Sequence, residues 1–342
     1  MRRILVAMSG GVDSAAACIL LQRQGYTVGG ATMLLRDGAE GEAEDARRAA
    51  EQMGIEFFLF DLRREFQERV IAPFTKTYQQ GGTPNPCVVC NRTMKFGLFL
   101  ERALELGYDG IATGHYARIV AENGSYLLKT AKSKDQTYML YGLTQYQLAH
   151  TLFPLGEANS KEEVRMLAQE AGLQLARKHD SQDICFVPDG DYMAYLTAHG
   201  LVPQVGNFVA PDGQILGRHG GMEAYTVGQR RGLGMAFGER VYVLDKRGTD
   251  VVVGQERLLF FRRVQIGDVN YIAYHPSEGK RRVQAKLRYT PRTAEAWLIP
   301  TETGCELLFD VPQRAPTNGQ AAVFYDGDTL LGGGTICGCQ AE

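Results

Sequence analysis

The segment Ser9-Gly10-Gly11-Val12-Asp13-Ser14 decides the fold of the first half of the chain. It lies between an apolar run at residues 3–8, expected to be a β-strand, and a helical pattern at residues 15–25. Glycines at such a junction let the backbone approach a phosphate closely, and the helix N-terminus supplies free N–H donors and a positive dipole end. The two serines add hydroxyl donors, and Asp13 can hold a magnesium ion that bridges phosphate oxygens. The segment therefore predicts a phosphate-binding loop at the end of the first strand.

The same segment departs from two common nucleotide-binding motifs. It has neither the lysine of GxxxxGK[ST] nor the spacing of GxGxxG, which argues against ordinary phosphotransferases and dehydrogenases. It resembles the PP-loop of the ATP-pyrophosphatase superfamily, whose members cleave ATP between the α and β phosphates and adenylate a substrate oxygen. A plain glycine-rich strand–helix turn is the alternative, and serine, aspartate and serine at these places make it the less favoured one.

Outward from this loop, apolar strand-like runs alternate with amphipathic helical patterns, which is typical of a parallel sheet covered by helices. Strands are expected at 3–8, 27–34, 55–62 and 109–113, helices at 15–25, 42–53 and 91–106, and a hairpin turn at Asn123-Gly124. After about residue 203, glycines become frequent and short β-like runs replace the helical patterns. A chain of 342 residues is long enough for two or three domains. We predict an α/β PP-loop domain of the adenine nucleotide alpha hydrolase type with a parallel sheet (1–203), a small central β-rich domain (204–268) and a C-terminal β-barrel (269–342).

The bulk composition is that of an ordinary globular protein, with 44% hydrophobic and 22% charged residues. No stretch approaches the roughly 20 apolar residues of a membrane span, and the first residues do not form a signal peptide, so we expect a cytoplasmic protein with no membrane partner. The net charge is only −2, but residues 278–292 carry six cations against Glu278. This basic stripe predicts either a phosphate-binding face or, equally, a solvated strand face.

Seven cysteines in unequal spacing argue against a disulfide framework. Cys87 and Cys90 form a CxxC beside the expected start of a helix at Asn91, where the helix dipole would lower a thiol pKa. Cys185 is distant in sequence, but its loop could meet the CxxC above the carboxyl edge of the sheet.

Three uses of these thiols remain open from the pattern alone. The CxxC could bind a structural zinc ion together with the CxC at Cys337 and Cys339, could be a redox pair, or could transfer sulfur, with zinc and sulfur transfer about even. Cys18 is expected in the core, and Cys305 is uninformative. No usable metal-ligand spacing links His150, His179 and His219, which are expected to be ordinary surface or packing residues.

Several motifs in order together resemble the tRNA-specific 2-thiouridylase family (MnmA/TrmU). They are SGGVDS (9–14), TPNPCVVCNRTMKF (83–96), ATGHYAR (112–118), KSKDQTYMLY (132–141), DSQDICF (180–186) and YTVGQRRGLG (225–234). The resemblance extends from residue 4 to AVFYDG at 322–327. It implies adenylation of the C2 oxygen of the wobble uridine by ATP, followed by sulfur transfer that gives 2-thiouridine. The central domain would then bind tRNA.

The resemblance also assigns roles by motif. ATP would contact Ala7, Met8, Ser9, Gly10, Gly11, Val12, Asp13, Ser14, Met33 and Gly114, with Mg²⁺ on Asp13. The catalytic residues would be Asp13, the nucleophile Cys90 and the persulfide carrier Cys185. The target base would meet Asn85, Pro86 and Cys87, and the tRNA would meet His115, Lys134, Asp135, Gln136, Arg288, Tyr289 and Gln320. The implied partners are the anticodon loop of tRNA and a persulfide donor, either a cysteine desulfurase or a relay protein.

Cys87 is the one informative departure, because many family members have Asp there. Cys87, Cys90 and Cys185 could instead hold a [4Fe–4S] cluster whose free iron carries a hydrosulfide, or Cys87 could be a bystander thiol. Two other functions remain as alternatives. One is a PP-loop AMP-forming ligase acting on a small substrate, and the other is a non-catalytic RNA-binding protein with a structural zinc.

Overall fold

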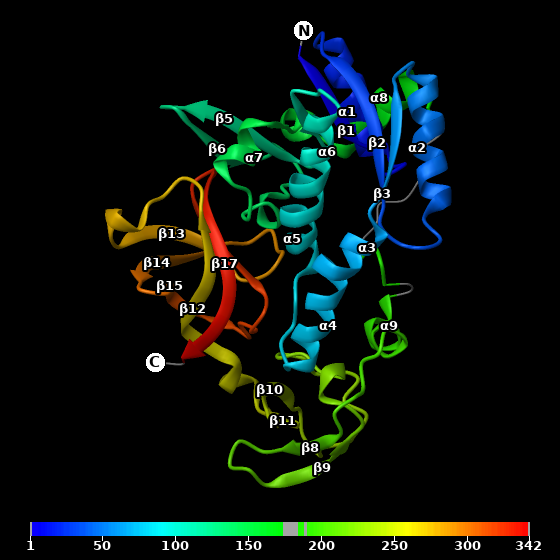
Figure 1. The fold of residues 1–342 in the computed structure, drawn as a ribbon. Helices are drawn as coiled ribbons and strands as arrows, with labels where there is room; N and C mark the ends of the chain where they lie inside the picture. The colour runs from blue at the N-terminus through cyan, green and yellow to red at the C-terminus, as the bar shows by residue number, and fades with distance from the viewer. Residues whose placement is uncertain (1, 174–183, 188–189, 341–342) are drawn as a thin grey trace.

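The computed structural model describes residues 2–173, 184–187 and 190–340, and its strands form three sheets (Figure 1). The first sheet is parallel and has the order β3-β2-β1-β4-β7. Its strands are β1 (Arg3–Ala7), β2 (Thr27–Leu34), β3 (Phe57–Asp61), β4 (Gly110–Ala112) and β7 (Thr151–Leu152). The first four start and end within two residues of the expected strands. The parallel α/β class expected for the first half of the chain is confirmed.

Helices cover both faces of this sheet because side chains alternate along each strand. On β1, Ile4 and Val6 share a hydrophobic cluster with α1 (Val12–Arg23), α2 (Glu40–Gln52) and α8 (Lys161–Glu170). Leu5 points the other way, into a cluster with Phe96 and Phe99. Strand β1 is therefore apolar on both faces, as a central parallel strand must be.

Two long helical runs connect β3 to β4 in the chain. The first is α3 (Arg63–Phe66), the π-helical η1 (Gln67–Ile71) and α4 (Ala72–Gln79), and the second is α5 (Pro86–Cys90), the π-helical η2 (Asn91–Leu98) and α6 (Phe99–Glu105). The sequence had suggested that the second run begins at Asn91, but it begins at Pro86. Asn85 caps it, since its side-chain oxygen accepts a hydrogen bond from Val88 N at 3.4 Å. Shorter helices follow at η3 (Thr137–Met139), α7 (Gln145–Ala149), η4 (Pro154–Glu157) and α9 (Tyr192–Ala198).

The C-terminal part is a closed antiparallel barrel, as expected. Its strands are β12 (Phe260–Tyr271), β13 (Arg281–Lys286), β14 (Ala294–Thr301), β15 (Gly304–Arg314), β16 (Ala321–Asp326) and β17 (Thr329–Gln340), with η9 (Pro276–Glu278) between β12 and β13. They follow the order β12-β15-β14-β13-β16-β17, and a further pairing of β12 with β17 closes the ring. Closure leaves these strands without a free edge.

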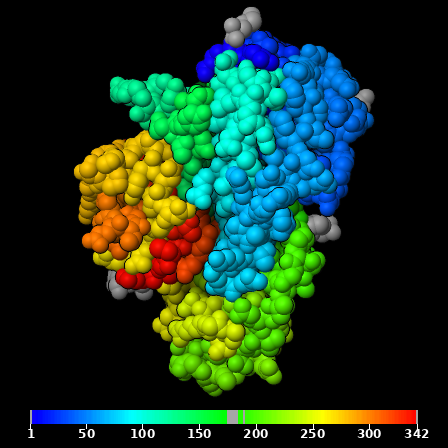
Figure 2. Space-filling view, viewed as in Figure 1, coloured from blue at the N-terminus to red at the C-terminus, as the bar shows by residue number. Residues whose placement is uncertain are grey.

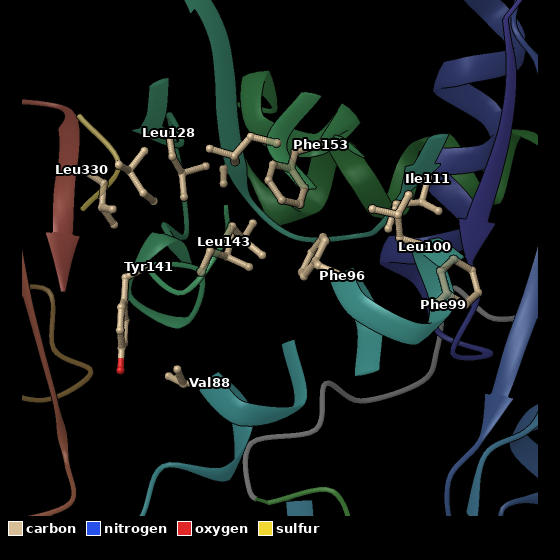
Figure 3. Close-up of a cluster of buried hydrophobic side chains, with 14 of the residues drawn as sticks. Val88, Phe96, Phe99, Leu100, Ile111, Leu128, Tyr141, Leu143, Phe153 and Leu330 are labelled. Carbon is tan, nitrogen blue, oxygen red and sulfur yellow. The ribbon is translucent and has the colours of Figure 1, made fainter. Parts of the chain in front are cut away.

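A hairpin from the first half of the chain extends this barrel. Strands β5 (Ala117–Glu122) and β6 (Ser125–Thr130) turn at Asn123-Gly124, both at positive φ, so the expected hairpin turn is confirmed. Strand β6 then pairs with β17, with Leu128 opposite Leu330. Figure 3 shows the shared core running from these two leucines to Phe99 and Ile111 beside the parallel sheet. In Figure 2, the orange and red barrel lies directly against the cyan helical runs.

A smaller β-rich unit lies at the lower end of the molecule in Figure 1. It contains β8 (Gly206–Val209), β9 (Ile215–His219), β10 (Tyr242–Arg247) and β11 (Asp250–Gly254) in the order β10-β11-β8-β9, with η7 (Met222–Ala224) and η8 (Glu256–Leu259). Strand β12 crosses the division predicted at 268–269, so the first barrel strand starts before it. The three-way division itself stays a prediction. Within the described ranges, no helix has both the length and the apolar character needed to cross a membrane.

Candidate active site

The PP-loop lies where the strand order of the parallel sheet reverses. The chain moves from β1 to β2 and β3 on one side, and β4 lies on the other side of β1. Loops that follow adjacent strands diverge at such a point and leave a crevice at the carboxyl ends of the strands, where open α/β sheets bind ligands. The loops after β1 and β4 therefore face the same crevice.

Backbone conformation and one hydroxyl fix the loop in shape. Gly10 has a φ of +66°, and a Cβ built on it would lie 2.6 Å from the Glu42 carbonyl oxygen. The Ser14 hydroxyl donates to the Gly11 carbonyl at 3.1 Å and accepts from Ser9 N at 3.3 Å. Gly11 precedes helix α1, whose first N–H groups have no partner within the helix. The loop is thus held ready to present N–H donors to an anion.

The remaining residues expected to contact ATP surround this loop. Ala7 ends β1, Met8 is buried behind the loop and accepts a hydrogen bond from Thr32 Oγ1 at 2.8 Å, and Val12 is the first residue of α1. Met33 is partly buried in β2, the neighbouring strand. A Cβ built on Gly114, after β4, would lie 2.9 Å from Asp13 and Ser14 atoms. The structure therefore brings residues 7–14, 33 and 114 to one edge of the sheet.

Asp13 is bound by two side chains that the sequence analysis did not single out. Lys161 Nζ, at the start of α8, donates to the two carboxylate oxygens of Asp13 at 2.6 and 2.7 Å. The Tyr116 hydroxyl donates to Asp13 Oδ1 at 2.8 Å. Oδ1 thus accepts from both side chains, whereas Oδ2 accepts from Lys161 alone. Lys161 and Tyr116 therefore compete with a cation for this carboxylate, and magnesium binding by Asp13 stays a prediction.

Cys87 and Cys90 lie on the short helix α5, Cys87 in its first turn and Cys90 at its last residue. Because the helical run starts at Pro86, Cys90 lies inside it and not at its N-terminus, which corrects the expectation of a dipole-lowered thiol pKa. Burial raises the pKa of Cys90 to about 12. Burial also raises the pKa of Cys87. In this conformation, burial favours the protonated thiol at both cysteines.

The charge of Lys95 on η2 acts on the three cysteines and on His115 in the loop after β4. Its positive charge opposes the desolvation that raises the pKa values of Cys87, Cys90 and Cys185. It also adds to the desolvation that lowers the pKa of His115 well below its usual range. The half-buried Lys95 thus lies within electrostatic reach of all four groups. A thiolate formed here would gain from that charge.

Cys185 differs from Cys90 in accessibility. It is exposed, whereas Cys90 is buried, and the pKa values of Cys87 and Cys90 are both raised by its proximity. Cys185 lines a cavity of about 430 Å³. The other lining residues are Leu35, Arg36, Asp37, Arg63, Gln67, Ile71, Phe186, Tyr195 and His199. The carrier candidate is therefore open to solvent on one side.

All seven cysteines lie in the described part of the chain, and all are free thiols. No three His, Cys, Asp or Glu side chains among the described residues converge as a metal-binding group. Among the described residues, the CxxC and the CxC at Cys337 and Cys339 therefore do not form a shared zinc site. A [4Fe–4S] cluster on Cys87, Cys90 and Cys185, whose ligands stand farther apart than those of a single ion, stays a prediction. Cys18 is fully buried in the core, as expected.

One group of the expected tRNA residues gathers around Tyr116. The Gln136 side chain accepts a hydrogen bond from Tyr116 N at 2.9 Å, and Lys134 Nζ lies 5.6 Å from the Tyr116 ring centroid. Tyr289 is half-exposed, and its hydroxyl donates to the Asp135 carbonyl at 3.2 Å. Arg288 donates to the carbonyls of Arg314 and Ala315 in the barrel. In the loop after β4, His115 Nδ1 lies 2.7 Å from Thr113 Oγ1. This group joins the ATP crevice to the barrel.

A second group lies at the start of α5. Gln320 Nε2 donates to the carbonyls of Thr83 and Pro84 at 3.0 and 3.2 Å. Gln320 thereby ties the barrel to the loop that carries Asn85 and Pro86. The residues expected to contact tRNA therefore form two clusters, and each cluster connects the first half of the chain with the barrel.

Three of the six cations of the basic stripe, Arg281, Arg282 and Lys286, pair with carboxylates. Arg281 pairs with Glu278 at 3.0 Å and with Asp326 at 2.6 Å, and Arg282 pairs with Asp310. Lys280 stacks over the Trp297 ring at 4.2 Å. The ion pairs of the β13 arginines thus favour the prediction of a solvated strand face over that of a phosphate-binding face.

The histidines outside the site make local packing contacts, as expected. The His150 ring lies 4.5 Å from that of Tyr146, and the buried His219 ring packs against Phe208 and Tyr225. His179 lies outside the described residues.

Three family models match the chain from end to end. The "tRNA methyl transferase HUP domain" matches residues 2–189, the "tRNA methyl transferase PRC-barrel domain" residues 194–255, and the "Aminomethyltransferase beta-barrel domain" residues 261–336.

Curated relatives match over nearly the whole chain. A "tRNA-specific 2-thiouridylase MnmA" of Clostridium botulinum (strain Alaska E43 / Type E3) is 43% identical, and the alignment covers 98% of each chain. Proteins of the same name from Pelotomaculum thermopropionicum and Halothermothrix orenii are 44% and 45% identical over 98% of this chain and 97% and 99% of theirs. With family models that match all three parts of the chain and with this identity over nearly its full length, the chain belongs to the tRNA-specific 2-thiouridylase family.

Proposed function

We propose that this protein is an ATP-dependent tRNA sulfurtransferase that converts the wobble uridine of tRNA into 2-thiouridine. The observation that carries the proposal is the continuity of the site. Gly114 packs on the PP-loop, the next residue is His115, and Lys95 connects His115 electrostatically with Cys90 and Cys185. His115 and Lys95 therefore lie between the phosphate loop and the two thiols, which supports a nucleotide site and a sulfur-transfer site in one functional region. We place the reaction in the cytoplasm, with tRNA as the substrate.

The first step would activate the base. The C2 oxygen of uridine is a poor leaving group, so the oxygen attacks the α-phosphate of ATP, pyrophosphate leaves, and the oxygen becomes part of an adenylate. The loop N–H groups stabilise the charge that develops on the phosphates. The base must leave the anticodon stack to reach the crevice, which costs a few kcal/mol and least in a single-stranded loop.

The second step would deliver sulfur from a persulfide on Cys185. The terminal sulfur attacks C2, AMP leaves, and a disulfide joins the base to Cys185. The Cys90 thiolate then attacks the Cys185 sulfur, which releases 2-thiouridine and leaves a Cys90–Cys185 disulfide. A thiol reductant supplies the two electrons that restore both cysteines. This route needs the Cα atoms of Cys90 and Cys185 within about 7 Å in the reacting state.

The sulfur donor would reach Cys185 from the solvent side. Cys185 is exposed at its cavity, whereas Cys90 is buried. A persulfide-bearing cysteine of a desulfurase or relay protein could therefore load Cys185 without entering the crevice. The family model describes methyl transfer, but a phosphate-binding loop beside two thiols supports adenylation and sulfur transfer better.

The direct test combines two readouts. Purified protein receives ATP, an anticodon-loop tRNA and a persulfide donor, and we expect pyrophosphate release together with 2-thiouridine in the digested nucleosides. Cys90→Ser and Cys185→Ser should abolish 2-thiouridine and keep ATP binding. Pyrophosphate exchange with a small carboxylate and without tRNA would instead support an AMP-forming ligase.

A second preparation tests the sulfur carrier. We expect anaerobically purified protein without iron or labile sulfide to thiolate tRNA with a persulfide donor. Thiolation that appears only in preparations with iron and labile sulfide would contradict the persulfide route. Bound zinc without pyrophosphate release would support a non-catalytic RNA-binding protein.

A further inference from the structure

Lys161 lies against the PP-loop although it is far from it in the sequence. It is the first residue of α8, directly after Ser160, whose side chain accepts a hydrogen bond from Glu163 N at 3.2 Å. Its ammonium group contacts the two carboxylate oxygens of Asp13 at 2.6 and 2.7 Å. The Lys161 side chain is only 14% exposed. A lysine is thus held almost out of solvent at the edge of the nucleotide crevice.

Helix formation does not account for a lysine at this position. The N-terminus of a helix carries a partial positive charge, so a cation in the first turn is opposed by the helix dipole. Burying an ammonium group also costs hydration. Glu162 and Glu163, in the same turn, have the charge that the helix favours. The position of Lys161 therefore works against the stability of α8.

The crevice gives this lysine a use. Helices α1 and α8 both begin there, so their N-termini make the site attractive for an anion. The Asp13 carboxylate alone would repel a polyphosphate, and the Lys161 ammonium offsets that charge. An ammonium group has three donors that reorient easily, so it can stay near a carboxylate and also contact a phosphate oxygen. The Tyr116 hydroxyl, which donates to Asp13 at 2.8 Å, holds the carboxylate in place.

We propose that Lys161 binds the phosphate chain of ATP, with Asp13 and Tyr116 as positioning residues, so that α8 supplies the lysine that the SGGVDS loop lacks. This inference rests on the proposed use of ATP. It also gives a role to the contact between the Asp13 carboxylate and the Lys161 ammonium group.

The test compares ligands with and without phosphates. Affinities of the full-length protein for ATP, pyrophosphate and adenosine are measured by calorimetry for the wild type and for Lys161→Met. A hydrogen bond to a charged group corresponds to a change of about 10- to 100-fold in affinity. We expect ATP and pyrophosphate to bind that much more weakly to Lys161→Met, and adenosine to bind as before. Lys132→Met is the matched control, because Lys132 pairs with Glu157 on the surface at 2.8 Å, and its ATP affinity should not change.

Two outcomes would overturn the inference. An ATP affinity of Lys161→Met within twofold of the wild type would exclude a phosphate contact, and an equal loss for ATP and adenosine would show a structural role. If Lys161→Met does not fold, Lys161→Arg is tested in its place because it keeps the positive charge. Its adenosine affinity should be unchanged, and its ATP affinity should fall by at most about 10-fold. A wild-type protein that binds no ATP would refute the proposed function itself, which separates the two failures.

Discussion

Gly114 packs so closely against the start of α1 that a single methyl group should disturb the PP-loop. A Cβ on Gly114 would lie 2.9 Å from Asp13 C, Asp13 Cβ and Ser14 N, whereas ordinary contact begins at 3.4 Å. In Gly114→Ala, the start of α1 must therefore move away by about 0.5 Å, the difference between 2.9 Å and the 3.4 Å of an ordinary contact. Overpacking of this kind typically costs about 1–3 kcal/mol of stability. A phosphate hydrogen bond lost through the shift would weaken ATP binding by roughly 10- to 100-fold.

The assay is calorimetric titration with ATP, together with thermal unfolding. Gly41→Ala is the matched control, because Gly41 lies in the exposed helix α2 with nothing within 4 Å of an added Cβ. The control should bind ATP normally and gain up to about 1 kcal/mol from its higher helix propensity. If Gly114→Ala binds ATP within twofold of the wild type and unfolds at the same temperature, the close packing on Asp13 does not hold the loop, and the reasoning fails.

Tyr116→Phe removes a hydrogen bond to a charged acceptor, so it should lower the free energy of unfolding by about 1–3 kcal/mol; an unchanged urea midpoint would contradict this. Gln320→Ala removes both hydrogen bonds to the loop at residues 83–84, so amide hydrogen exchange of that loop should speed up and tRNA should bind more weakly, with ATP affinity unchanged. At pH 8, an alkylating reagent should modify the exposed Cys185 well before the buried Cys90, as followed by peptide mass spectrometry. Because the pKa of Cys90 is raised to about 12, its thiolate fraction and alkylation rate should rise about tenfold per pH unit from pH 7 to 10. A plateau below pH 9 would show a much lower pKa.

Local sequence predicted the strand–loop–helix unit well because its determinants are neighbours in the chain. The apolar run, the glycines and the helical pattern all lie within residues 3–25, and the structure has β1, the loop and α1 there. The turn at Asn123-Gly124 was predictable for the same reason, since both residues adopt positive φ readily. Cys90 shows the limit of such reasoning. An N-cap at Asn85 starts the helix before the cysteine, so burial and not the dipole sets its pKa.

Pairings between distant segments could not be read from the sequence. Strand β6 pairs with β17 about 200 residues later, and neither strand carries a local signal for the other. The same holds for Arg281 and Arg282 of the basic stripe, which meet Asp326 and Asp310 only after the barrel closes. A run of cations looks alike in the sequence whether or not carboxylates lie opposite it.

By itself, the sequence determined the strand–loop–helix unit at residues 3–25 and the order of α/β and β-rich parts, and its motifs predict Cys90 and Cys185 as the reacting thiols. Only the tertiary structure decided which charges surround them. Lys161 neutralises Asp13 from a helix that starts 148 positions later, and Lys95 places one ammonium within reach of three cysteines and His115. The physical reason is that local backbone preferences act over a few residues, whereas electrostatic contacts depend on where folding brings side chains together.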